Sequence, residues 1–529
     1  MTADGEYTTS TALLRALRAG GVRYAFANLG SDHAGIIEAY ARGRHDGTID
    51  QFPELVICPH ESVALSAAHG YAQITGQAQA VIVHVECGTQ NLGGMLHNAA
   101  KGRVPVLIFA GASPYTQRGE LPGSRTEFIQ WIQDVPDQRG IVRGYTKYDN
   151  EIRTGRNVDQ LVGRALQIAH SEPAGPVYLM AAREVLAESL DPTSPPRAGF
   201  APVAPAALAA QVVEHIAGAL LEARHPLVIN SYLGRHPEAV GRLVQLCELL
   251  AIPVLESVPS YVNFPADHPL HVGYQWNTPA QNPTLASADV VLVLGSDVPW
   301  IPTRNRPADD ARIFVIDADP LKEQMPLWHV PAECFARADL GTALAQLTDR
   351  LRTRPLDDAP PVLGFVGRLS VEKNVSLLAR VQQELVSQGV TNFRFCIIGQ
   401  GIKENWLREH LPGAEFPGVL RGEALARAYA NMDLFIFPSH TDTFGNVVLE
   451  ALASGVPAIV TPNGGPSSII REGETGLIAQ DEGFASAAAS ILMDPALHAR
   501  MRHKARGYAR KTSWDTVFET VYDGYRTIL

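Results

Sequence analysis

The sequence lacks long hydrophobic runs, although 46% of its 529 residues are hydrophobic. No stretch approaches the roughly 18 apolar residues that a membrane-spanning helix needs. The N-terminal segment "MTADGEYTTSTALLRALRAGG" contains no apolar core of a secretory signal. We therefore expect a cytoplasmic protein without a transmembrane segment.

Cysteine and clustered positive charge are also scarce. The five cysteines, an odd number, are far apart and lie mostly inside apolar stretches. They indicate reduced core thiols rather than a disulfide framework or a zinc site. Asp and Glu outnumber Lys and Arg by 55 to 44, which gives a net charge of −11, and the charges are scattered. A surface for nucleic acid or acidic membranes is therefore not expected.

Short β-branched runs alternate with longer Ala- and Leu-rich helical patterns along the chain. This alternation is typical of parallel sheets covered by helices on both faces. The length predicts about three domains, and Pro-rich breaks at residues 190–207 and 352–361 separate three blocks. We predict three consecutive doubly wound, mainly parallel α/β domains at residues 1–195, 196–355 and 356–529.

The apolar runs predict the strands of these sheets, each ending where a loop could face a ligand. The predicted strands are residues 23–30, 55–61, 79–88, 104–111 and 175–181 in the first block, 225–234, 251–257, 288–297 and 311–319 in the second, and 362–369, 393–401, 434–439 and 456–461 in the third. Glu61 is placed at one such strand end, before a small-residue helix. A solvated carboxylate is the commoner role of an isolated glutamate there, so the neighbouring motifs must decide.

Several motifs in the first block resemble the pyrimidine-binding domain of acetolactate synthase-like thiamine diphosphate enzymes, over about residues 9–190. They are "GSDH" (30–33), "HESVALSAAHGYAQITG" (60–76), "VECGTQN" (85–91) in place of a Gly-Pro-Gly-type loop, "IQD" (132–134) and "GPVYL" (175–179). The resemblance implies that Glu61 is catalytic: it would hydrogen-bond the aminopyrimidine ring and promote the tautomer that generates the ylid. The cofactor-binding residues that it implies are Gly30, Glu61, Gln90, Asn91 and Gln133.

The second block resembles the central domain of the same enzymes through "ADVVLVLGSDVPWIP" (288–302) and "ARIFVIDADPLK" (311–322). That domain is structural or holds an accessory nucleotide, and the Gly-Ser-Asp turn at 295–297 leaves both roles open. These enzymes bind the magnesium diphosphate through a Gly-Asp-Gly in a third domain, and no Gly-Asp-Gly occurs here. Thiamine diphosphate is thus a candidate cofactor whose magnesium diphosphate motif is absent, and no metal ligand is predicted.

The third block begins with two nearby cations, Arg368 and Lys373, in "VGRLSVEKN" (366–374). Two cations at the mouth of a sheet suit a diphosphate, although a lone pair of this kind is more often a surface accident. The stretch "TDTFGNVVLEALASGVP" (441–457) predicts a loop and a helix whose first N–H groups can bind an anion. Asp442 alone would be a plain N-cap. Glu450 is expected on a mostly buried helix, where ribose hydroxyls would serve as donors.

Together with "IIGQG" (397–401) and "ANMDLFIFPS" (430–439), these motifs resemble the C-terminal, Rossmann-like donor domain of retaining GT-B glycosyltransferases of family 4, over about residues 359–529. The resemblance implies that Arg368 and Lys373 hold the diphosphate, that Asp442 binds the sugar hydroxyls and that Glu450 binds the ribose. It also places Gly399 and the backbone amides of Phe444, Gly445 and Asn446 at the nucleotide sugar. Asp442 replaces the family's usual Glu, which leaves the sugar preference open.

The favoured function is retaining glycosyl transfer from a nucleotide-diphosphate sugar to an unknown acceptor. The family's usual acceptor domain is not recognisable in the preceding block. Two alternatives remain open: a thiamine diphosphate-dependent carboligase or decarboxylase that needs a partner for its diphosphate domain, and a non-catalytic binding or regulatory fusion. We also expect a homo-oligomer formed through the thiamine-enzyme-like domains.

Overall fold

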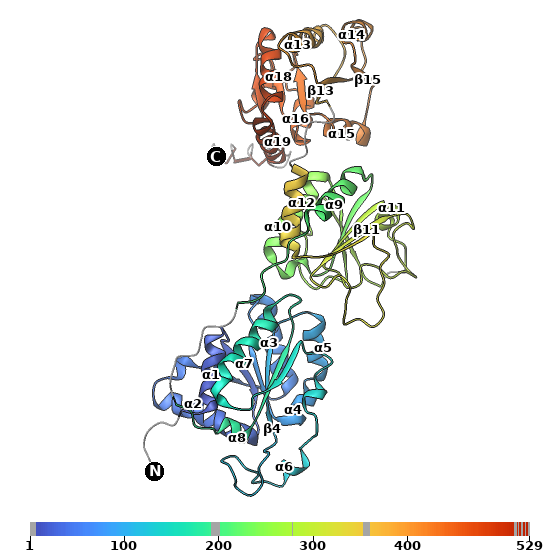
Figure 1. The fold of residues 1–529 in the computed structure, drawn as a ribbon. Helices are drawn as coiled ribbons and strands as arrows, with labels where there is room; N and C mark the ends of the chain where they lie inside the picture. The colour runs from blue at the N-terminus through green and yellow to red at the C-terminus, as the bar shows by residue number, and fades with distance from the viewer. Residues whose placement is uncertain are drawn as a thin grey trace. The chain divides into compact units, whose positions relative to one another are not determined.

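The computed structural model describes residues 7–191, 201–277, 279–352 and 360–512, together with residues 516, 518, 519, 522, 523, 525 and 526. It divides into two compact units, Met1–Thr353 and Arg354–Leu529. The first unit holds two six-stranded sheets and the second unit holds one (Figure 1). We call these the first module (7–191), the second module (201–352) and the third module (360–512).

The paired strands of all three modules are parallel, so the prediction of three consecutive α/β domains with mainly parallel sheets is confirmed. The predicted domain boundaries, after residues 195 and 355, lie outside the described residues and stay predictions.

The sheet of the first module has the strand order β2-β1-β3-β4-β6-β5. Its strands are β1 (Tyr24–Asn28), β2 (Glu54–Ile57), β3 (Ala80–Val83), β4 (Leu107–Ala112), β5 (Tyr148–Glu151) and β6 (Val177–Ala182). Its helices are α1 (Thr9–Ala19), α2 (Ala34–His45), α3 (Glu61–Thr75), α4 (Val85–Asn91), α5 (Gly93–Lys101), α6 (Ile129–Ile132), α7 (Val158–His170) and α8 (Arg183–Leu186).

Two buried layers cover this sheet, because successive strand residues point to opposite faces. Ala80 and Ile82 pack with α1, α2 and α7 on one face. Val81 and Val83 pack with α3 and α5 on the other. Strands buried on both faces read as continuous apolar runs, which is why the sequence located β3 and β4.

The sheet of the second module has the order β12-β11-β10-β7-β8-β9. Its strands are β7 (Pro226–Asn230), β8 (Val254–Ser257), β9 (His271–Gln275), β10 (Val290–Leu294), β11 (Arg312–Asp317) and β12 (Cys334–Arg337), and its helices are α9 (Ala210–Glu222), α10 (Pro237–Leu250), α11 (Pro283–Ser287) and α12 (Leu340–Arg352). Helices α9, α10 and α12 cover one face. The other face is covered by the short α11 and by loop residues such as Trp300 and Val330, where longer helices were expected.

The sheet of the third module has the order β15-β14-β13-β16-β17-β18 over one continuous core. Its strands are β13 (Val362–Val366), β14 (Arg394–Ile398), β15 (Glu415–Gly418), β16 (Leu434–Phe437), β17 (Ala458–Val460) and β18 (Gly476–Ile478). Its helices are α13 (Ser376–Ser387), α14 (Glu404–His410), α15 (Gly422–Ala430), α16 (Asn446–Ala453), α17 (Pro466–Ile469), α18 (Phe484–Leu492) and α19 (Pro495–Arg510).

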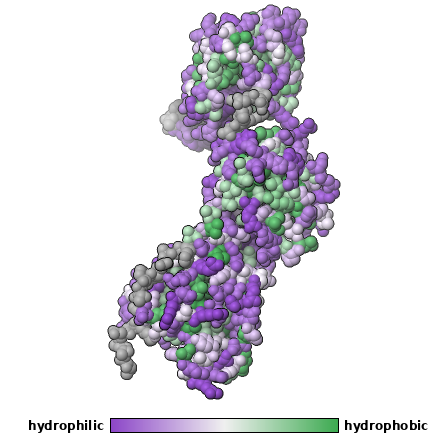
Figure 2. All heavy atoms as spheres, viewed as in Figure 1, coloured by the Kyte–Doolittle hydropathy of each residue, from purple (hydrophilic) through white to green (hydrophobic). Residues whose placement is uncertain are grey.

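Hydrophilic residues cover most of the surface that is visible in Figure 2, with smaller hydrophobic areas between them. Within the described parts of the chain, no helix combines the length and the hydrophobicity that crossing a membrane requires.

Candidate functional site

In each sheet the strand order reverses direction next to its first strand: between β1 and β3, between β7 and β10, and between β13 and β16. Open α/β sheets bind ligands outside the carboxyl ends of the strands at such a point. Gly30 follows β1, the Gly-Ser-Asp turn at 295–297 follows β10, and Arg368 follows β13. All three groups of predicted site residues therefore lie at the expected edge of their sheet.

Glu61 is the first residue of α3, and β2 ends at Ile57, so its predicted place at the end of a strand is corrected. The residue is only 5% exposed. Its Oε2 accepts a hydrogen bond from Nδ2 of Asn91, at 3.0 Å. A Cβ added to Gly88 would lie 3.3 Å from Glu61 Oε1, so a small residue is what keeps space beside this carboxylate. The structure thus brings Glu61 and Asn91 together.

Two further predicted residues of the first module gather around His84 instead. A Cβ on Gly30 would lie 2.1 Å from His84 Nδ1. Glycine is therefore needed at position 30 for the His84 ring to approach the backbone there. Nε2 of Gln133 lies 3.3 Å from His84 Nε2 and 3.7 Å from the Cys87 sulfur. Gln90 is exposed on α4.

The segment 85–91, which stands where a Gly-Pro-Gly-type loop was expected, forms helix α4. Gln90 and Asn91, at the end of this helix, are both exposed, and Asn91 is the one that donates a hydrogen bond to Glu61.

Sequence reasoning missed an ion pair at the same edge, between Asp32 and His84. Asp32 is 3% exposed; its Oδ1 lies 2.5 Å from His84 Nδ1, and its Oδ2 accepts from the Val85 N–H at 3.2 Å. Burial would raise the pKa of Asp32, but the neighbouring histidines outweigh it and hold that pKa below its ordinary value. The hydrogen bond to Asp32 raises the pKa of His84. The signal was present, since His84 directly follows β3 and Asp32 lies four residues after the end of β1.

These residues match one end of thiamine diphosphate. The buried carboxylate of Glu61, oriented by Asn91, suits a ring nitrogen of the aminopyrimidine. A magnesium diphosphate needs several oxygen ligands. The described residues contain no group of three or more His, Cys, Asp and Glu side chains that could hold a metal ion. They therefore fit the pyrimidine end of the cofactor.

In the third module, Lys373 and Asp442 form an ion pair. Lys373 Nζ lies 2.5 Å and 2.6 Å from the two carboxylate oxygens of Asp442. Both side chains are 18% exposed, and the ammonium lies 5.7 Å from the centre of the Phe437 ring. Asp442 is not an N-cap: Gly445 caps α16, without a side-chain hydrogen bond. The two residues were predicted to hold different parts of one ligand, and the structure places them in direct contact.

The neighbouring strand ends are close enough to require glycine. Gly399, after β14, has φ of +136°, and a Cβ there would lie 1.9 Å from the carbonyl oxygen of Gly367. Arg368 directly follows Gly367. Its side chain is 72% exposed and lies 3.7 Å from Glu372. The turn therefore presents a cation to solvent at the reversal point of the third sheet.

The loop before α16 is anchored by backbone contacts. Gly465 donates its N–H to the Asp442 carbonyl at 2.8 Å. A Cβ on Gly465 would lie 2.1 Å from the Thr443 carbonyl oxygen, and Gly445 has φ of +91°. Phe444 and Asn446 are exposed. The loop thus presents the start of α16 at the surface.

Glu450 is exposed, so the expectation of a mostly buried carboxylate is wrong. The buried neighbour is Tyr429, which is 2% exposed and donates its hydroxyl to Glu450 Oε2 at 2.9 Å. Burial raises the pKa of Tyr429, and the Glu450 charge adds to the effect. Tyr429 therefore stays a protonated donor that orients one oxygen of Glu450 and leaves the other for a ligand.

His440 links the two loops that carry Lys373 and Asp442. Its Nε2 lies 3.3 Å from Nδ2 of Asn374, beside Lys373, and 3.0 Å from Asp481 Oδ1, and its Nδ1 accepts from Asn463 at 3.2 Å. Asn374 donates to Asp481 Oδ2 at 3.1 Å from a backbone with φ of +51°. No sequence motif singled out this network, because its members are up to 107 positions apart.

Comparisons with known families agree with the three modules. Residues 7–141 match the model of the thiamine pyrophosphate enzyme N-terminal TPP binding domain, residues 213–347 match that of the thiamine pyrophosphate enzyme central domain, and residues 360–494 match that of the group 1 glycosyl transferases. The chain joins two thiamine pyrophosphate enzyme domains to a group 1 glycosyl transferase domain. The resemblances inferred from the motifs are thereby confirmed.

Curated relatives match the glycosyl transferase domain. GDP-mannose-dependent alpha-mannosyltransferase of Mycolicibacterium smegmatis is 37% identical over 182 residues, which cover 34% of this chain and 47% of the relative. The protein of the same name from Corynebacterium glutamicum is 35% identical over 174 residues, which cover 32% of this chain and 41% of that relative. The chain thus spans about half the length of these curated relatives or less.

A solved structure resembles the fold of almost the whole chain. It is the thiamine diphosphate-dependent 4-hydroxybenzoylformate decarboxylase of Rhodococcus jostii RHA1, with a TM-score of 0.54 and 21% identity, covering 95% of this chain and 93% of that one. At this identity the likeness shows the fold alone, and it agrees with the two thiamine pyrophosphate enzyme domains at the N-terminal end.

Proposed function

We propose that the group 1 glycosyl transferase domain binds a nucleotide-diphosphate sugar and that the protein transfers this sugar, with retention, to an acceptor that is not yet known. The observation that carries the proposal is the Lys373–Asp442 pair at the reversal point of the third sheet. A cation and a carboxylate in contact there offer one group to a diphosphate and one to sugar hydroxyls. The names of the matching relatives support the same donor class.

Each side chain then has a distinct task. Lys373 and Arg368 bind the diphosphate and stabilise the negative charge that grows on it as the sugar leaves. Asp442, released from Lys373, accepts hydrogen bonds from the sugar hydroxyls. The N–H groups at the start of α16 face the phosphate and the sugar, and Glu450, oriented by Tyr429, accepts from the ribose hydroxyls.

GDP-mannose is the first donor to test, since two matching relatives carry it in their names. A thermal-shift panel of GDP-mannose, UDP-glucose, ADP-glucose and thiamine diphosphate with Mg²⁺ decides the class of ligand. A ligand that binds only the native state stabilises it by roughly 2.7 kcal/mol at about 100 times its Kd. We expect a nucleotide sugar to raise the unfolding midpoint, and no shift with any of them would contradict the proposal.

A second candidate function is thiamine diphosphate-dependent carboligation or decarboxylation with a partner chain that supplies the diphosphate domain. The buried carboxylate of Glu61, hydrogen-bonded to Asn91, favours it. A shift with thiamine diphosphate and Mg²⁺, but with no nucleotide sugar, would put this function first. Binding of donors without transfer to any acceptor would favour the non-catalytic fusion. The homo-oligomer expected through the thiamine pyrophosphate enzyme domains stays a prediction that light scattering can check.

Glu450→Gln should weaken GDP binding more than Asp442→Asn does. Glu450 is assigned to the ribose, and a hydrogen bond to a charged group contributes about 1.5–3 kcal/mol. Asp442 is assigned to the sugar, which GDP lacks, and Asp442→Asn also releases Lys373 for the diphosphate. Calorimetry on the full chain should show at least about a tenfold weaker Kd for Glu450→Gln, since 1.4 kcal/mol is a factor of ten, and little loss for Asp442→Asn.

The matched control is Glu423→Gln, because Glu423 is an exposed carboxylate of the same module that pairs only with Arg427 in its own helix among the contacts described. It should bind GDP as the wild type does. Equal GDP affinity in Glu450→Gln and Asp442→Asn would show that the division of roles is wrong.

A further inference from the structure

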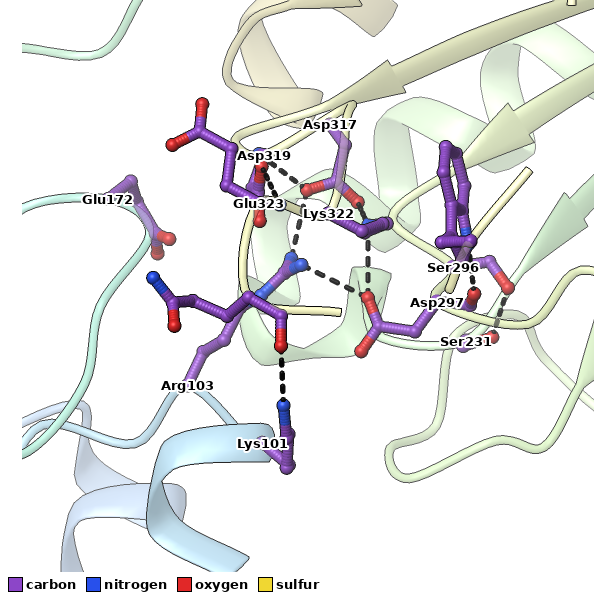
Figure 3. A network of polar contacts seen from close by, with 12 residues as sticks. Lys101, Arg103, Glu172, Ser231, Ser296, Asp297, Asp317, Asp319, Lys322 and Glu323 are labelled. Atoms are coloured by element: carbon purple, nitrogen blue, oxygen red, sulfur yellow. Dashed lines mark hydrogen bonds and ion pairs between the residues drawn. The ribbon is translucent and has the colours of Figure 1, made fainter. Parts of the chain in front are cut away.

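Four charged side chains form a buried cluster at the carboxyl ends of β10 and β11 in the second module (Figure 3). The Arg103 guanidinium lies 2.9 Å from Asp317 Oδ1 and 3.0 Å from Asp297 Oδ1. Lys322 Nζ lies 2.6 Å from Asp317 Oδ2 and 3.0 Å from Asp297 Oδ1. Arg103 belongs to the first module, whereas the other three residues belong to the second, so the cluster joins the two modules.

The side chains are almost completely removed from solvent: 10% of Arg103, 14% of Asp297, 2% of Asp317 and 1% of Lys322 is exposed. Two cations face two carboxylates, so the cluster is neutral as a whole. Burial would raise the pKa of Asp297, but Lys322 and Arg103 outweigh it and hold that pKa below its ordinary value. Each of the two carboxylates has both cations within 3.0 Å.

The cluster occupies the edge at which open α/β sheets bind their ligands. The adjoining reversal point, between β7 and β10, is closed as well. Ser231 and Ser296 share a hydrogen bond of 2.7 Å, and the Tyr232 N–H donates to the Gly295 carbonyl at 3.1 Å. Trp328 donates its indole N–H to the Asp297 carbonyl at 2.8 Å. Side chains and backbone groups of the protein thus occupy the space at the Gly-Ser-Asp turn. The sequence had left open whether this turn binds an accessory nucleotide.

The backbone gives an independent reason to assign a role to the two cations. Arg103 and Lys322 each have φ of +54°, a conformation that is uncommon for residues other than glycine. Asn, Asp or Gly would adopt it more easily. Long cationic side chains at both strained positions are explained by the contacts that they make with Asp297 and Asp317.

We propose that Arg103 acts as an internal ligand of the second module, so that its strand-end crevice is a docking surface for the first module and binds no nucleotide. A nucleotide phosphate entering this crevice would displace Arg103 and meet the carboxylates of Asp297 and Asp317, which repel it. Other contacts surround the same surface. Lys101 Nζ donates to the Gln324 carbonyl at 3.2 Å, and Glu172 Oε1 lies 3.3 Å from His236 Nε2.

Hydrogen exchange of the full-length chain, read by mass spectrometry, tests the docking. In Arg103→Met, Asp317 and Asp297 lose a buried partner, which strongly destabilises such a cluster. Backbone amides of residues 99–105 and 312–328 should exchange at least about tenfold faster as the docked state opens. The matched control is Arg143→Met, because Arg143 is 52% exposed and pairs with Asp137 inside the first module; it should leave both segments unchanged.

Arg103→Lys serves if Arg103→Met does not fold, since a lysine keeps the charge but cannot contact both carboxylates with separate nitrogens. Its exchange in residues 312–328 should be faster than that of the wild type. ADP at 1 mM is the nucleotide probe, and residues 290–298 of the wild type should keep the same exchange with and without it. Protection of these residues by ADP, or unchanged exchange of residues 312–328 in the folded Arg103 variants, would overturn the proposal.

Discussion

Lys373→Ala should weaken the binding of a nucleotide-diphosphate sugar by roughly tenfold to a hundredfold. A charge-assisted contact of this kind contributes about 1.5–3 kcal/mol, and a factor of ten in Kd corresponds to about 1.4 kcal/mol. Lys373 is also positioned before the donor arrives, because Asp442 and the Phe437 ring hold its ammonium. Calorimetric titration of the full chain with GDP-mannose, or with whichever donor gives a thermal shift, measures the loss.

In the same titration, Arg368→Ala should weaken donor binding by a smaller factor. Its side chain is 72% exposed without a donor, so ordering it on the diphosphate costs side-chain entropy that offsets part of the contact. Lys504→Ala is the matched control, since Lys504 is exposed on α19 of the same module. Unchanged affinity in both Lys373→Ala and Arg368→Ala would remove the diphosphate site from this sheet edge.

Gly399→Ala should destabilise the third module and abolish measurable donor binding. The new methyl group would lie 1.9 Å from the Gly367 carbonyl oxygen, which is backbone and cannot move aside cheaply, and φ is +136°. A strained position of this kind costs about 1–3 kcal/mol, and the clash adds to that cost. For a module of 150–250 residues each kcal/mol lowers the midpoint by about 2–4 °C, so calorimetry should show a fall of roughly 6 °C or more.

Gly507→Ala is the matched glycine control. Gly507 lies in α19 with nothing within 4 Å of an added Cβ. Alanine favours helix over glycine by about 0.5–1 kcal/mol, so this variant should unfold at the same temperature or slightly higher and bind the donor normally. If Gly399→Ala had the same unfolding temperature and the same donor affinity as Gly507→Ala, the strand-end turns would not shape the site.

The strands that the sequence missed are less buried than most of those that it located. Every central strand was predicted, because a strand covered on both faces reads as a continuous apolar run, as in β10 (Val290–Leu294). The missed strands all lie at sheet edges: β5, β9, β12, β15 and β18. Their residues are largely half-buried or exposed, as in β5 (Tyr148–Glu151) and β15 (Glu415–Gly418). An edge strand is held in place by hydrogen bonds to the backbone of its neighbouring strand. Such bonds leave little hydrophobic pattern in the sequence.

The site residues divide in a similar way. Motifs singled out Glu61, Lys373 and Asp442 as candidates because each follows an apolar strand, where the fold class alone predicts a ligand edge. They misjudged Glu450, whose neighbours on α16 are apolar although its own side chain is exposed. Local composition describes the helix as a whole, whereas exposure depends on which side of it the packed sheet covers.

The sequence by itself determined the three parallel sheets and the order of two thiamine pyrophosphate enzyme domains and a glycosyl transferase domain, because these depend on local hydrophobic runs and short motifs. Only the tertiary structure decided which charges meet. Arg103 is 214 positions from Asp317, and Lys373 is 69 positions from Asp442. Ion pairs act through distances of a few ångströms, and such distances between remote residues exist only after the sheets have formed and packed.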